Sequence, residues 1–145
     1  MTIIKNNYEL AVKNIPEIFC NNYKLFIDVF INSSKYIALI DSGSTNTLMT
    51  SNIINNEQLD YLVDMNFNNN INTLNCEIDT IGRIWYLNIQ LNNKNYNIDA
   101  IISPLIVNYL PYDIILGLDF LMINNIDILL TKNSLRINNL DILIN

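Results

Sequence analysis

The residues of this chain that could do hydrolytic chemistry are carboxylates. The 145 residues include no histidine, which is the usual general base of serine and cysteine hydrolases and the commonest ligand of catalytic zinc. The two cysteines, Cys20 and Cys76, have no C-x-x-C spacing, and we interpret them as reduced thiols. A hydrolase with this composition must use aspartate or glutamate, and we expect neither a metal nor a cofactor.

Asp41 is the strongest candidate among these carboxylates. It directly follows the apolar stretch Ala38-Leu-Ile40 and precedes Ser42 and Gly43. A carboxylate at the end of a buried strand is costly unless it is hydrogen-bonded or used, and glycine lets backbone N–H groups approach it closely. Taken alone, these residues are equally typical of an Asp-Ser-Gly turn that closes a hairpin.

A second motif favours an active-site loop over a plain turn at Asp41. The stretch Ile114-Ile-Leu-Gly117 ends an apolar strand in glycine and is followed by Leu118 and Asp119. In aspartic proteases, a strand of this kind passes beside the Asp-Ser/Thr-Gly loop, and the missing side chain of the glycine leaves room for that loop. The two motifs together resemble one subunit of a retropepsin, with Leu116 and Gly117 as the structural residues beside the active site.

The elements that must position these motifs are mostly strands. Alternating or β-branched stretches predict one hairpin from Leu25–Ile31 and Lys35–Ile40, with its turn at Asn32-Ser-Ser34. A second hairpin is predicted from Ile81–Leu91, with alternate residues on one face, and Tyr96–Ile102. Trp85 and Tyr86 are interpreted as packed residues of that strand. Shorter strands are expected at Asp113–Leu116, Ile126–Leu130, Ser134–Ile137 and Leu140–Ile144.

Helices are expected at only a few places. Ser51 could cap a short helix that runs through Glu57, and Leu118–Ile123 has helical character after a glycine. Residues 1–20 are predicted to form an N-terminal arm or short helix, and residues 21–145 a retropepsin-like protease domain. The polar run Asn66–Asn75 is predicted to be an exposed loop.

From about Asn14 to Ile144 the chain resembles the retropepsin domain of the DNA-damage-inducible ubiquitin-shuttle proteases. The resemblance implies an all-β fold, a closed retropepsin-like barrel with one or two short helices, and a homodimer. The stretches that carry it are Pro16-Glu-Ile-Phe19, Leu25-Phe-Ile27, Thr47-Leu-Met-Thr50, Ile81-Gly-Arg-Ile84, Leu116-Gly-Leu-Asp119 and Leu135-Arg-Ile137.

Peptide hydrolysis by this route needs two carboxylates that share one proton, and the chain has one Asp-Ser-Gly motif. Two copies of Asp41 must therefore meet across a two-fold axis. Ser42 would brace the two loops through hydroxyl-to-backbone bonds across the dimer. Gly43 would let the backbone come close to the acid and the water. The hydroxyl of Ser44 could bond the catalytic carboxylate.

The resemblance places a substrate-covering flap at Asn69–Cys76, which lacks the glycines of the family's flap tip. Asparagine tolerates the left-handed backbone better than most residues, so a hairpin tip survives, with altered closure over a peptide. The predicted substrate-binding residues are Ser44, Ile71, Asn72, Leu74, Asn75 and Cys76. Apolar residues around Ile101–Leu110 could line pockets or belong to the core.

Charge and hydropathy limit the partners. The net charge is −6 and the basic residues are scattered, which argues against nucleic-acid binding. No apolar run approaches the ~20 residues of a membrane helix, so we expect a cytoplasmic protein. The expected partners are a second copy and a protein or peptide substrate, ubiquitin-tagged if the resemblance holds. Two alternatives stay open: a protease that processes a retroelement polyprotein, and a non-catalytic dimerisation or peptide-binding module.

Overall fold

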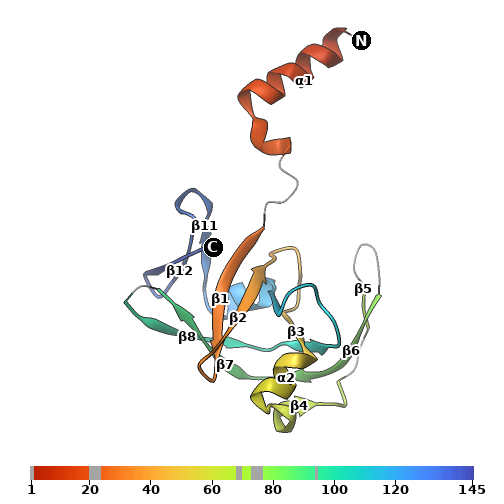
Figure 1. Cartoon of the computed structure of the whole chain (residues 1–145), viewed down its shortest axis with the longest axis vertical. Helices are drawn as coiled ribbons and strands as arrows, with labels where there is room; N and C mark the ends of the chain where they lie inside the picture. Colours follow the sequence, from red (N-terminus) through yellow and green to blue (C-terminus); the bar gives the residue numbers. More distant parts are fainter. Residues whose placement is uncertain (1, 20–23, 68–69, 73–76, 94) are drawn as a thin grey trace.

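The computed structural model describes residues 2–19, 24–67, 70–72, 77–93 and 95–145. The chain begins with helix α1 (Thr2–Asn14) and the 3-10 turn η1 (Pro16–Phe19), which stand apart from the strands in Figure 1. The two are held together in part by the rings of Tyr8 and Phe19, whose centroids lie 5.4 Å apart edge to face.

The first hairpin forms where the sequence predicts it. Strands β1 (Leu25–Ile31) and β2 (Ser34–Ile40) pair along their whole length, because alternate side chains of both face the core. The two-residue turn between them places Asn32 and Ser33 in the left-handed region, with φ of 50° and 70°. Strand β2 ends directly at Asp41.

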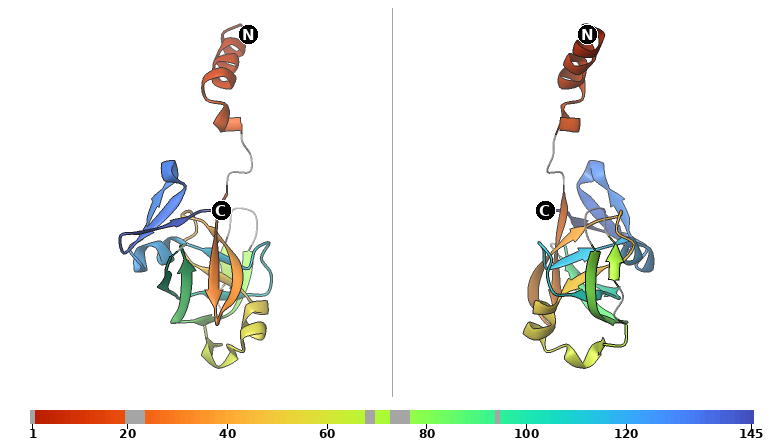
Figure 2. Two further views of the ribbon diagram at one scale, coloured as in Figure 1. Left: turned by 60° about the vertical axis from the view of Figure 1, so that its left-hand side comes forward. Right: turned by 90° about the vertical axis from the view of Figure 1, so that its right-hand side faces the viewer.

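The other strands extend this hairpin into a curled sheet, seen from two further directions in Figure 2. Among the described residues the sheet runs in the order β4-β6-β9-β3-β10-β2-β1-β7-β8, with β5 on β6. Its path has two ends, β4 and β8, so a curled half-barrel replaces the closed barrel expected. The bounds of these strands are β3 Leu48–Thr50, β4 Val63–Asp64, β5 Asn70–Asn72, β6 Glu77–Ile84, β7 Leu87–Asn92, β8 Asn97–Ile102, β9 Leu105–Val107 and β10 Ile114–Leu116.

Two of the strand pairs are parallel and bring distant segments together. Strand β10 lies along β2, with Leu116 opposite Ile40, and β9 lies along β3. Because parallel neighbours need long connections, this arrangement carries residues from both halves of the chain to the end of β2.

The single strand expected over Ile81–Leu91 is wrong. Strand β6 ends at Ile84 and β7 begins at Leu87, with Trp85 and Tyr86 exposed between them. Ile84 and Leu87 are both buried although they are three positions apart, so the two strands bury opposite parities. The interruption explains why one alternating pattern cannot describe the whole stretch.

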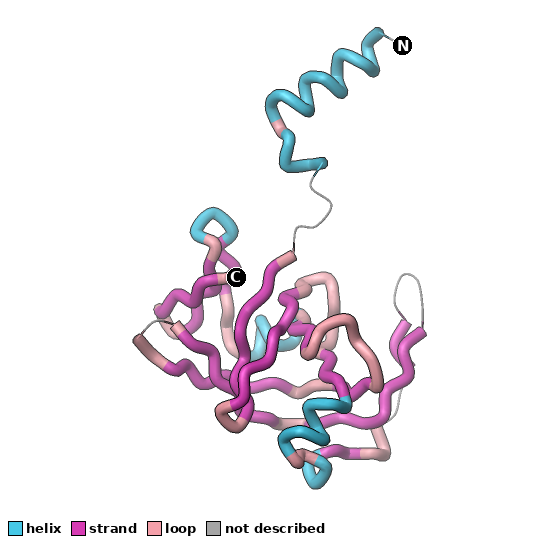
Figure 3. Tube along the Cα trace, in the orientation of Figure 1, coloured by secondary structure: helices cyan, strands magenta, loops and turns pink. Residues whose placement is uncertain are grey.

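The two short helices predicted from the sequence are present over the predicted residues, and Figure 3 shows them among the strands. Helix α2 covers Ser51–Glu57 and is followed by the 3-10 turn η2 (Asp60–Leu62), and α3 covers Leu118–Ile123. The expected cap at Ser51 is wrong: Thr50 precedes the first turn and makes no side-chain cap bond. The loop expected over Asn66–Asn75 contains β5, which pairs with β6.

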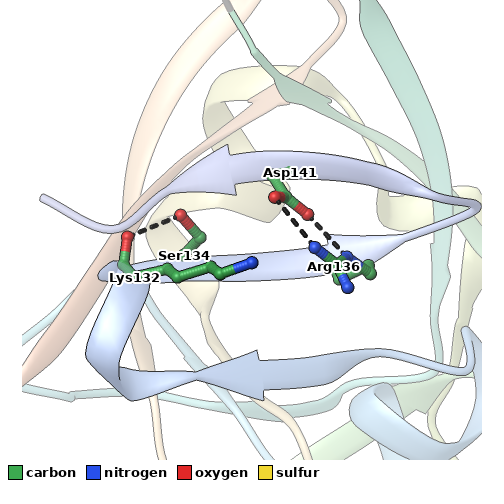
Figure 4. A network of polar contacts seen from close by, with 4 residues as sticks. All are labelled: Lys132, Ser134, Arg136 and Asp141. Carbon is green, nitrogen blue, oxygen red and sulfur yellow. Dashed lines mark hydrogen bonds and ion pairs between the residues drawn. The ribbon is translucent and has the colours of Figure 1, made fainter.

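A second, three-stranded sheet closes the chain: β11 (Asp127–Leu129), β12 (Ser134–Ile137) and β13 (Leu140–Leu143), with the 3-10 turn η3 (Leu130–Lys132) after β11. Figure 4 shows Arg136 and Asp141 paired across β12 and β13 through two hydrogen bonds of 2.8 and 3.2 Å. The bond from Arg136 holds the pKa of Asp141 below its usual value. Because the pair is exposed, it contributes little to stability.

One large apolar cluster unites both sheets. It includes Ile27 and Val29 of β1, Ile114 of β10 and Leu135 of β12, all fully buried. A smaller cluster of Leu48, Leu105, Val107 and Leu110 lies apart from it. Over the described residues, no helix is long and apolar enough to cross a membrane.

Candidate active site

Asp41 lies in a tight turn at the end of β2. Its backbone N–H donates to Leu116 O of β10 (2.9 Å), and its carbonyl accepts from Ser44 N (3.1 Å). The carboxylate Oδ1 accepts from Gly43 N (3.0 Å), the only hydrogen bond to this carboxylate among the described residues. Asp41, Ser42 and Gly43 are all exposed in the single chain, so the acid is held at one oxygen and open at the other.

Gly117 explains how the second motif supports this loop. A Cβ built at Gly117 would lie 2.6 Å from Asn46 O and 2.7 Å from Ser44 O, both backbone atoms. Leu118 N also donates to Ser44 O at 2.7 Å. The loop after Asp41 therefore rests directly on the backbone at Gly117, which leaves no space for a side chain.

A buried polar network fixes the same loop from beneath. Thr47, which is fully buried, donates from Oγ1 to Asp119 Oδ1 (2.8 Å) and accepts from Gly117 N (3.1 Å). The other carboxylate oxygen of Asp119 accepts from Thr47 N at 3.1 Å. Every polar atom of this network is paired, which is the condition under which buried polar groups rigidify a structure.

The sequence predicts no role for Thr47 or Asp119, although both lie in stretches that carry the family resemblance. Their contact spans 72 positions of the chain, so neither residue alone predicts it. One available signal was a hydroxyl at the head of the wholly buried stretch Leu48–Thr50, where an unpaired polar group would be costly.

Strand β2 is also anchored further from Asp41, by Asp113 directly before β10 and by helix α2. Ile37 N donates to Asp113 Oδ2 (3.0 Å), and the hydroxyl of Tyr36 donates to Glu57 of α2. Partial burial raises the pKa of Tyr36 to about 12, and the bond to Glu57 acts in the same direction. Tyr36 therefore keeps its proton over the physiological range and ties β2 to α2.

The other predicted site residues differ in where they lie. Ser44 is in the loop, but its hydroxyl donates to Asn46 O (2.8 Å) rather than to the Asp41 carboxylate. Ile71 and Asn72 belong to β5, where they pair with Ile78 and Glu77 of β6. The predicted residues Leu74, Asn75 and Cys76 lie outside the described residues.

These features, an aspartate loop at the end of one strand and a glycine directly after the parallel strand packed against that loop, match a known family. A family model described as aspartyl protease matches residues 16–130. The chain belongs to the aspartyl protease family. Its fold is similar to the retroviral protease-like domain of Ddi1 from Leishmania major, with a TM-score of 0.68 over 84% of this chain and 94% of that one. At 24% identity, this likeness concerns the fold, which is retropepsin-like and mostly β.

Two relatives of this aspartyl protease-family chain are similar in sequence. UBA domain-containing protein Mud1 of Schizosaccharomyces pombe is 34% identical over 64 residues, 44% of this chain and 19% of that protein. DNA damage-inducible protein 1 of Neurospora crassa is 36% identical over 50 residues, 34% of this chain and 11% of that protein. The chain thus spans a small part of the length of these relatives, and the resemblance to the DNA-damage-inducible proteins is confirmed.

We expect the buried network under the loop to matter for stability. The substitution Thr47→Val keeps the shape but leaves Gly117 N without an acceptor and removes one bond to Asp119. We expect the free energy of unfolding in urea to fall by about 2 kcal/mol, the usual cost of an unsatisfied buried donor. Thr50→Val is the matched control, because Thr50 Oγ1 makes only a 3.4 Å contact with Asp113 O. Equal effects of the two substitutions would contradict a special role for the Thr47 network.

Proposed function

We propose that two copies of this chain form an aspartic endopeptidase, with Asp41 from each copy at the two-fold axis. The observation that carries the proposal is the Asp41 loop. Its exposed carboxylate accepts a hydrogen bond from Gly43 N, and the loop backbone at Ser44 and Asn46 packs directly against Gly117. An acid that is both fixed and open to solvent suits proton transfer to a bound water and substrate.

In this proposal the two Asp41 carboxylates share one proton. One takes a proton from the attacking water, and the other donates to the carbonyl oxygen of the scissile peptide bond. Ser42 and Gly43 are proposed to complete the loop at the dimer axis. Like charges close together titrate as a coupled pair, so activity should depend on pH through the pair rather than through one residue.

The proposed substrate is a protein segment in an extended conformation. The relatives include a UBA domain-containing protein and a DNA damage-inducible protein, and on this basis we extend the proposal to ubiquitin-tagged proteins. The residues proposed to contact the peptide are Ser44, Ile71, Asn72, Leu74, Asn75 and Cys76.

A second candidate function is a dimeric module that binds peptides without cleaving them. The observation that favours it is the stretch Asn69–Cys76, which has no glycine where the family's flap tip is glycine-rich. Retention of Asp41 in a supported loop favours the protease. Both functions require the dimer to bind a peptide, and only the protease cleaves it.

We expect dimerisation and activity to be linked, because one chain supplies one carboxylate of the dyad. Sedimentation at micromolar concentration should give about twice the chain mass of 16.8 kDa. On dilution through the dissociation range, cleavage of a peptide per chain should fall in parallel with the dimer fraction. A monomer that cleaves peptide at an undiminished rate per chain would contradict the shared dyad.

A further inference from the structure

Arg83 packs against two aromatic rings at the base of the β5–β6 hairpin. The guanidinium carbon of Arg83 is 4.6 Å from the centroid of the Trp85 ring and 5.4 Å from that of Phe67. The two rings also meet edge to face, with centroids 5.2 Å apart. Because a planar guanidinium stacks on aromatic faces, Arg83 joins the chain entering the hairpin, at Phe67, to the chain leaving it, at Trp85.

Asp64 completes this cluster from the entering strand. Its Oδ2 accepts from Trp85 Nε1 at 2.9 Å, and its Oδ1 accepts from Asn66 N at 3.0 Å. Asp64 thus holds the indole and shapes the turn that carries Phe67, whose N–H donates to Asp64 O (3.3 Å). The two strands also approach closely here, since a Cβ at Gly82 would lie 2.7 Å from Asp64 O.

The cluster is connected to the loop that holds Asp41. Arg83 Nε donates to Ser103 Oγ (3.1 Å), and Ile84 N donates to Pro104 O (3.1 Å). The next residue, Leu105, donates from its N–H to Thr47 O at 2.9 Å. These three hydrogen bonds involve the consecutive residues 103–105, so this short segment joins the base of the hairpin to the Thr47 network beneath the Asp41 loop.

The hairpin begins where β6 separates from β9. Strand β6 shifts register against β9 between Thr80 and Gly82, and residues 77–79 pair with β5 instead. In Figures 1 and 2 the outer end of the β5–β6 pair and the chain after β2 lie on the same side of the sheet. Arg83 thus lies next to the point where β6 leaves β9 and pairs with β5 instead.

We propose that Arg83, which packs on Phe67 and Trp85 and lies opposite Asp64 in the β4–β6 pair, is a positioning residue that sets the β5–β6 hairpin over the Asp41 loop and thereby governs peptide affinity. The effect on affinity rests on the proposed protease or peptide-binding function. The positioning itself does not, and can be measured in a protein without activity.

The test compares Arg83→Met, which keeps an unbranched apolar stem but removes the charge and the donors, with Arg136→Met. Arg136 is the other arginine of the sequence and pairs with Asp141 far from the hairpin. For Arg83→Met we expect amide exchange of residues 77–80 to accelerate about tenfold and KM for a peptide to rise about tenfold, with kcat changed less than twofold. Acrylamide quenching of Trp85, the single tryptophan, should rise about twofold.

Two further variants keep the proposal falsifiable if Arg83→Met folds poorly. Arg83→Lys restores charge without the planar stack and should fall between wild type and Arg83→Met in exchange and KM. Ser103→Ala removes one link of the series and should shift the same readouts in the same direction by a smaller amount. Wild-type exchange at residues 77–80 in folded Arg83→Met would overturn the proposal, as would altered Trp85 quenching with unchanged KM in an active enzyme. If wild type proves inactive, the exchange measurement alone decides.

Discussion

Replacement of Asp41 by asparagine is expected to remove peptide cleavage, with a fall in kcat/KM of at least about 10³-fold. The amide is isosteric and can still accept the bond from Gly43 N, so the loop should keep its shape. It cannot exchange a proton with water or with the scissile carbonyl. The midpoint temperature of thermal unfolding should be unchanged or slightly raised, because the substitution removes the repulsion between two acids at the dimer axis. Cleavage of a peptide and a thermal melt of the same preparation measure both.

Asp127→Asn is the matched control, since it makes the same charge change at an exposed residue of the C-terminal sheet. It should cleave at the wild-type rate. An equimolar, re-equilibrated mixture of wild type and Asp41→Asn tests the shared dyad further, because only about a quarter of random dimers would keep both acids. If Asp41→Asn cleaves as well as wild type, the dyad is wrong. If wild type and variant bind an extended peptide equally and neither cleaves it, the binding module is the function.

Substitution of Gly117 by alanine should lower the free energy of unfolding by about 3 kcal/mol. The new Cβ would meet three backbone atoms of Asn46 and Ser44 at 2.6 to 2.7 Å, and backbone held on both sides cannot relax as a side chain can. The loop that carries Asp41 would be displaced, so activity should fall with stability. Urea unfolding at one fixed protein concentration measures the change, since dimerisation contributes to it.

The matched comparison is Gly43→Ala, whose Cβ would meet only the Asp41 side chain, at 3.2 Å. None of the glycines has a positive φ, so any difference between the two substitutions reflects contact rather than backbone strain. We expect Gly43→Ala to change stability by less than about 1 kcal/mol. Equal destabilisation by the two substitutions would show that Gly117 does not support the loop in this way.

Local patterns predicted the elements that carry their own signal. The β1–β2 hairpin has alternating burial and a turn of Asn32 and Ser33, and α3 follows a glycine with no breaker inside it. Strands β3 and β9 were missed because they are three residues long and buried on both faces, so they show no alternation. The stretch Ile81–Leu91 misled because its apolar spacing continues across a real break at Trp85 and Tyr86.

Some residues of the candidate site were likewise indicated by local patterns and others were not. Asp41 and Gly117 could be selected from the sequence because each lies in a short motif and the two motifs together resemble a retropepsin subunit. The packing of Gly117 against the loop agrees with its expected structural role, and the catalytic role of Asp41 stays a prediction. The roles of Thr47, Asp119 and Arg83 depend on partners that only the folded sheet brings near, such as the 20 positions between Arg83 and Ser103. The sequence also predicted a bond from the Ser44 hydroxyl to the Asp41 carboxylate, whereas this hydroxyl donates to the carbonyl of Asn46 two residues on.

The parallel pairing of β2 with β10 has a consequence for the order of events in folding. Asp113 lies 76 positions beyond Ile37, the residue it bonds, so the support of the Asp41 loop forms only by closing a long segment of chain. During synthesis the β1–β2 hairpin emerges well before its partner strand, and Asp41 remains at the end of an unsupported ribbon. Topologies with such distant contacts fold slowly. A newly made chain thus has no supported Asp41 loop until β10 has also left the ribosome.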